Sequence, residues 1–60
     1  MNEVMKGILS RCLTEEIERQ NKWKKQDIEY GFDGKQRDLI ISDIRDFMET
    51  NEIPVYIKVN

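Results

Sequence analysis

Apolar side chains recur every three or four residues over two long stretches of this chain and then alternate with polar ones at its end. A period of three to four residues is typical of an amphipathic helix, and a period of two is typical of a β-strand. The pattern therefore predicts a helix over residues 3–29, a turn over 30–33, a second helix over 34–50 and a strand over 53–59.

The first helical stretch has one apolar face that includes two polar positions. Gly7 weakens its first turns, and Thr14 could act as the N-cap of a separate helix, so two shorter helices remain an alternative. One helix is favoured because the apolar face continues from Met5 to Leu13 without a change of phase. The expected inner face is Met5, Ile8, Leu9, Cys12, Leu13 and Trp23, with Glu16 and Gln20 among them.

The turn carries the residues that end one helix and begin the next. Gly31 can adopt the left-handed conformation of a helix end, and Asp33 with Gln36 has the spacing of a capping box. Because the loop is short, the two helices should form an antiparallel hairpin. The expected apolar face of the second helix is Ile40, Ile41, Ile44, Phe47 and Met48.

The C-terminal strand has no second strand in the chain with which to pair. Unpaired strand edges attract other strands, so we expect it to pair with its equivalent across the two-fold axis of a homodimer. At 1.5 Å per residue, the first helix is also about 15 Å longer than the second, so part of its apolar face extends beyond the second helix and needs a partner. The fold class is thus mainly α, a small α+β protein, with expected interface residues Met5, Ile8, Leu9, Cys12, Ile53, Val55, Tyr56, Ile57 and Val59.

Length and composition narrow the functional classes. A chain of 60 residues makes one domain with a small core, and a single cysteine cannot form an internal disulfide. The absence of histidine excludes Ser-His-Asp and Cys–His nucleophiles. With no long apolar run and no signal peptide, we expect a cytoplasmic protein without cofactor or catalytic site.

Two acidic pairs could in principle hold a divalent cation. Glu15 and Glu18 lie in the first helix, and Asp43 and Asp46 in the second. Most of these carboxylates point away from the apolar faces, so they would not converge. We therefore expect solvated surface and no metal site.

Four residues are candidate contacts to a target protein. Glu16 lies within the apolar face of the first helix, where a carboxylate needs a partner, and Arg37 occupies the matching face of the second helix. Aromatic residues are enriched at interface hot spots. The candidates are Glu16, Trp23, Tyr30 and Phe32.

One basic cluster offers an alternative function. Its members are Arg19, Lys22, Lys24 and Lys25, with Trp23 between them. An aromatic ring among lysines can stack on bases, but nucleic-acid binders usually carry a sustained basic stripe. This chain has net charge −2, so nucleic acid is not the favoured partner.

The favoured interpretation is a small non-enzymatic regulator or inhibitor that binds a larger protein. Small proteins of this size that begin at Met1 are often accessory factors of phages or mobile elements, acting in the host cytoplasm. The alternatives are a dimeric nucleic-acid-binding regulator that uses the basic cluster, and an assembly subunit whose C-terminal strand joins a partner's sheet.

Overall fold

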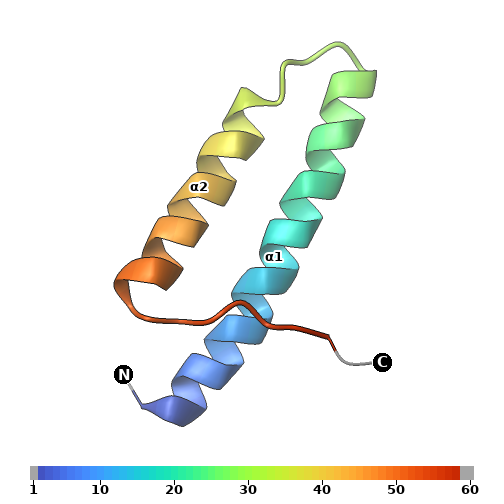
Figure 1. The fold of residues 1–60 in the computed structure, drawn as a ribbon. Helices are drawn as coiled ribbons and strands as arrows, with labels where there is room; N and C mark the ends of the chain where they lie inside the picture. The colour runs from blue at the N-terminus through green and yellow to red at the C-terminus, as the bar shows by residue number, and fades with distance from the viewer. Residues whose placement is uncertain (1, 59–60) are drawn as a thin grey trace.

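The computed structural model describes residues 2–58, which form a hairpin of two antiparallel helices. Helix α1 spans Glu3–Glu29, helix α2 spans Lys35–Thr50, and the segment after α2 turns back across α1 (Figure 1). The first stretch is therefore one uninterrupted helix, as favoured from its continuous apolar face. The predicted hairpin is confirmed, and the second helix begins one residue later than expected.

The end of α1 is closed by backbone hydrogen bonds around Gly31. Gly31 has a φ of 92°, and its N–H donates to the Ile28 carbonyl oxygen at 3.1 Å. The N–H of Phe32 donates to the Asp27 carbonyl oxygen at 2.9 Å. These two bonds form a Schellman motif, which requires the left-handed conformation predicted for this glycine.

The start of α2 differs from the expected capping box. Its N-cap is Gly34, with a φ of 73° and no side-chain cap. The Asp33 carboxylate instead accepts a hydrogen bond from the N–H of Lys35 at 3.0 Å. Asp33, the residue before the N-cap, therefore satisfies a backbone donor in the first turn of α2. Gly34 fits this close turn, because a Cβ there would lie 3.0 Å from Cγ of Lys24.

The core is small and lies where α1, α2 and the C-terminal segment meet. Its buried apolar side chains are Ile41, Met48 and Ile53. Thr14 and Gln20 of α1 are also buried, whereas Met5, Ile8 and Cys12 are exposed. Helix α1 is thus rotated from the predicted orientation, because the face that packs also receives the C-terminal segment.

On α2, the predicted apolar face is divided. Ile41 and Met48 are buried and Ile44 is half-buried, but Ile40 and Phe47 remain exposed. Helix α2 therefore directs only the centre of its apolar face at α1, and the edge of that face stays open.

The predicted strand is not present among residues 53–58. The segment instead runs as an irregular extended chain over α1 (Figure 1). Ser10 donates a hydroxyl hydrogen bond to the Pro54 carbonyl oxygen, and the Tyr56 N–H donates to the Thr14 hydroxyl at 2.9 Å. Two backbone groups that were expected to pair with another strand, the Pro54 carbonyl and the Tyr56 N–H, therefore bond to side chains of the same chain.

Over the described range, neither α1 nor α2 has the length and apolar character needed to cross a bilayer. Both helices carry charged side chains along their length.

Candidate protein-binding surfaces

The hairpin is a single layer of helices with two broad faces. Its principal extents are 42, 28 and 11 Å. The C-terminal segment crosses one face, where it bonds to Ser10 and Thr14. Within residues 2–58, no segment crosses the opposite face (Figure 1).

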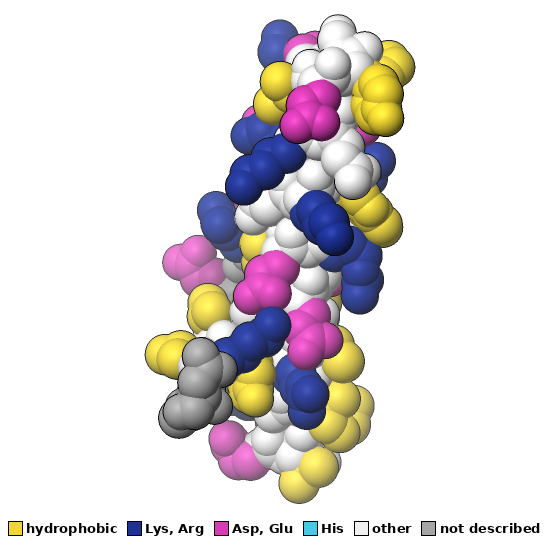
Figure 2. Space-filling model, turned by 90° about the vertical axis from the view of Figure 1, so that its right-hand side faces the viewer, with side chains coloured by type: hydrophobic (Ala, Val, Ile, Leu, Met, Phe, Trp, Pro, Cys, Tyr) yellow, Lys and Arg dark blue, Asp and Glu magenta, His cyan; other side chains and the backbone are white. Residues whose placement is uncertain are grey.

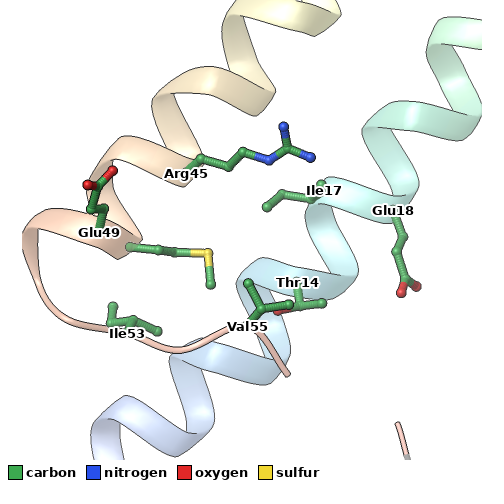
Figure 3. A pocket seen from close by; sticks show the side chains of 8 residues that line it. Thr14, Ile17, Glu18, Arg45, Glu49, Ile53 and Val55 are labelled. Carbon is green, nitrogen blue, oxygen red and sulfur yellow. The ribbon is translucent and has the colours of Figure 1, made fainter. Parts of the chain in front are cut away.

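On the covered face, the C-terminal segment and the two helices enclose a mostly apolar groove of about 300 Å³, the tail-side groove. In Figure 3, Ile17 extends from α1 toward α2, while Val55 extends from the C-terminal segment toward the same space. Polar side chains stand at its rim. The groove is lined by Thr14, Ile17, Glu18, Arg45, Met48, Glu49, Ile53 and Val55.

The C-terminal segment is held in place by more than its two hydroxyl contacts. Lys58 forms an ion pair with Glu18 at 3.3 Å, between two well-exposed side chains. The guanidinium of Arg11 lies 5.8 Å from the centroid of the Tyr56 ring. These exposed contacts are individually weak, so the buried hydroxyl contacts and Ile53 fix the groove wall.

The uncovered face carries a stripe of exposed apolar side chains, the open face. On α1, Met5 lies seven residues before Cys12, and Cys12 lies eleven residues before Trp23, so these three side chains share one stripe. On α2, Ile40 and Phe47 follow Arg37 by three and ten residues and lie on the stripe beside it. The Arg37 guanidinium lies 5.1 Å from the centroid of the Trp23 ring, so both stripes lie on the same side. The open face consists of Met5, Ile8, Cys12, Trp23, Ile40 and Phe47.

A polar network borders the open face between the helices. The carboxylate of Glu16 accepts hydrogen bonds from Arg19 at 2.6 Å and from the Gln20 amide at 3.2 Å. Arg37 donates to the Gln20 amide oxygen at 3.1 Å and to Asp27 at 3.0 Å. Gln20, which is 7% exposed, therefore connects the ion pairs on its two sides.

The network identifies the partner that Glu16 needs. That partner is Arg19 of the same helix, and Arg37 pairs with Asp27. The rotation of α1 places Gln20 between Glu16 and Arg37. The sequence indicated Gln20 on the inner face, but not its role as a bridge.

The remaining predicted contact residues are spread over three regions. Leu9 is half-buried, Ile53 is buried in the core, and Tyr56 and Ile57 are exposed on the covered side. Tyr30 and Phe32 are exposed at the interhelical turn, with 81% and 67% of their surface accessible. Val59 lies outside the described residues. The structure therefore does not gather the predicted interface residues into one surface.

The basic cluster is partly neutralised. Arg19 pairs with Glu16, and Lys24 pairs with Asp38 of α2 at 2.7 Å. Lys22 and Lys25 are exposed. Figure 2 shows Lys and Arg side chains interspersed with Asp and Glu along this side of the molecule, a pattern unlike a sustained basic stripe.

Between residues 2 and 58, no group of three or more Asp, Glu or Cys side chains is placed to hold a metal ion. Glu15 instead forms an ion pair with Arg11 at 3.3 Å, and Glu18 pairs with Lys58.

The fold is a two-helix hairpin with a docked C-terminal segment. No protein-family model, curated protein or solved structure matches this chain. The physical properties of its surfaces are therefore the basis for a functional proposal.

Proposed function

We propose that this chain is a small non-enzymatic regulator that binds a larger protein. The supporting observation is the excess of exposed apolar side chains. Among residues 2–58, thirteen large hydrophobic side chains are exposed, whereas three hydrophobic side chains form the buried core. Large exposed apolar patches mark sites of association.

The tail-side groove is the proposed contact site for the target. A volume of about 300 Å³ suits one large apolar side chain, and such anchors dominate the energy of many protein interfaces. Ile17, Met48 and Val55 supply apolar walls, while Arg45 and Glu49 supply polar groups at the rim. The groove can thus accept an apolar anchor flanked by polar residues.

A substitution at Val55 tests this site. Val55 is 67% exposed, so Val55→Glu should leave the fold intact while placing a charge in the groove. We expect retention of the target from cells that make the protein to fall at least tenfold, equivalent to about 1.4 kcal/mol. The measurement is affinity capture with tagged protein, with nuclease added and with washes at low and high salt.

Leu39→Glu is the matched control, because Leu39 is 65% exposed and lies on the outer edge of α2. It should retain the target as well as the unchanged chain does. Equal retention by Val55→Glu would contradict the groove assignment. Partners that disappear with nuclease, or that weaken steeply between about 50 and 200 mM salt, would instead support nucleic-acid binding through the basic cluster.

Strand pairing is not part of this proposal. Residues 53–58 form no strand, and the hydroxyl groups of Ser10 and Thr14 occupy backbone groups that a partner strand would need.

A further inference from the structure

The part of the chain that the structure describes supplies no second layer over the open face. Domains generally place at least two layers of secondary structure around a core, but this hairpin is 11 Å thick in its shortest extent. None of the described side chains is fully enclosed. A partner that supplies another helical layer would complete the core.

The exposed side chains of the open face come from both helices. Met5 and Ile8 are 46% and 52% exposed on α1, while Ile40 and Phe47 are 39% and 46% exposed on α2. In Figure 2, the largest group of hydrophobic side chains lies at the lower right margin, opposite the C-terminal segment. The exposed stripe therefore spans both helices of the hairpin.

The outline of the hairpin is large enough to hold the interface of a stable dimer. Its two longer extents, 42 and 28 Å, bound a rectangle of roughly 1,200 Å² around the whole hairpin. A standard interface buries about 800 Å² on each partner. An interface of that size fits within the outline of the hairpin, so a partner of equal size can cover the open face.

The charges beside the open face favour an identical partner over a charged one. Arg19 is paired with Glu16, and Arg37 is paired with Asp27, so two cations are balanced by two anions. Such a surface offers little net attraction to a polyanion or a polycation. It also causes little net repulsion when it meets a copy of itself.

We infer that a second copy of this chain covers the open face, forming a two-fold symmetric four-helix dimer. Helical hairpins that pack face to face bury their apolar stripes in the same way as a four-helix bundle. The inference rests on and extends the proposed function, since each tail-side groove stays on the outside of the dimer and free for the target.

Sedimentation analysis of the full chain tests this arrangement, from low micromolar to near-millimolar concentration. We expect a mass twice the 7.2 kDa of one chain at the upper end. Ile40→Glu should halve that mass, because it places a charge on the open face. Leu39→Glu, one residue away on the outer edge of α2, should remain dimeric.

Cys12 provides a test that needs no substitution. Its side chain is exposed in a single chain and lies on the open face. Modification by a soluble thiol reagent should therefore slow as the protein concentration rises. Ile40→Glu should restore rapid modification at every concentration while keeping the helical circular dichroism of the unchanged chain.

A mass of 7.2 kDa at every concentration, with a constant rate of Cys12 modification, would overturn the dimer. If Ile40→Glu unfolds, protection of Cys12 in the unchanged chain decides the question alone. Val55→Glu should remain dimeric while losing the target. Failure of the groove and failure of the dimer are therefore measured separately.

Discussion

Ser10 and Thr14 give the C-terminal segment its position, because their buried hydroxyls bond to backbone groups more than forty residues away. Ser10 is 5% exposed and Thr14 is 7% exposed, which is unusual for polar side chains in a domain this small. Each is tolerated because its hydrogen bond is satisfied.

Ser10→Ala should destabilise the folded state by about 1 to 2 kcal/mol, since the Pro54 carbonyl oxygen loses its hydroxyl donor. The free energy of unfolding measured in urea checks this expectation. Ser42→Ala is the control, because Ser42 is exposed on α2 and gains the same helix propensity. An equal effect of the two substitutions would mean that the Ser10 contact contributes nothing.

Residue-level contacts were only partly predictable from the sequence. Arg37 was expected on the face of α2 that matches Glu16, and Gln20 lies between the two side chains as a bridge. A helical wheel assigns directions on one helix, whereas such a bridge depends on how far each helix rotates. A serine or threonine on an apolar face gives no sign of which distant backbone it will bond.

At the scale of elements, two of the three glycines have opposite roles in the hairpin. Gly7 lies inside α1 with open space around it, whereas Gly31 ends the helix with a φ of 92°. Of these two positions, only Gly31 needs the conformational freedom of glycine.

Gly7→Ala should therefore stabilise the protein by about 0.8 to 1 kcal/mol through helix propensity. Gly31→Ala should destabilise it by about 1 to 2 kcal/mol, because a Cβ is strained in the left-handed region. The free energies of unfolding of both variants in urea measure the two effects. Effects of the same sign would contradict this account of the two glycines.

The elements themselves were largely predictable, since both helices and their turn follow from periodicity and helix-end residues. The rotation of α1 was not. Its sequence carries apolar residues on more than one side, and the face that packs also bonds to Pro54 and Tyr56, which lie beyond both helices. Over residues 53–58 the strand prediction was wrong, because alternation in the sequence does not reveal which groups will accept the backbone hydrogen bonds.

At the scale of the whole molecule, one layer of helices leaves most large hydrophobic side chains in contact with water. A single chain therefore gains little from burial, and most of its core would form on association. Stability of such a protein should depend on its concentration.

The thermal midpoint should rise with concentration if the second copy covers the open face. A tenfold increase in protein concentration adds about 1.4 kcal/mol to the free energy of unfolding of each dimer, which raises the thermal midpoint by roughly 4 to 8 °C. Differential scanning calorimetry over two decades of concentration measures this shift. Ile40→Glu should unfold at a midpoint independent of concentration, and a constant midpoint for the unchanged chain would argue against the dimer.

The docked C-terminal segment also implies an order of events during folding. The contacts of Ser10 with Pro54 and of Thr14 with Tyr56 span 44 and 42 positions, whereas the turn between the helices joins near neighbours in the chain. Contacts between near neighbours form first, because they close the smaller loops. The hairpin should therefore assemble before the segment docks, and transient undocking should open the tail-side groove while both helices stay intact. The target site would then be the last part of the protein to form and the first to open.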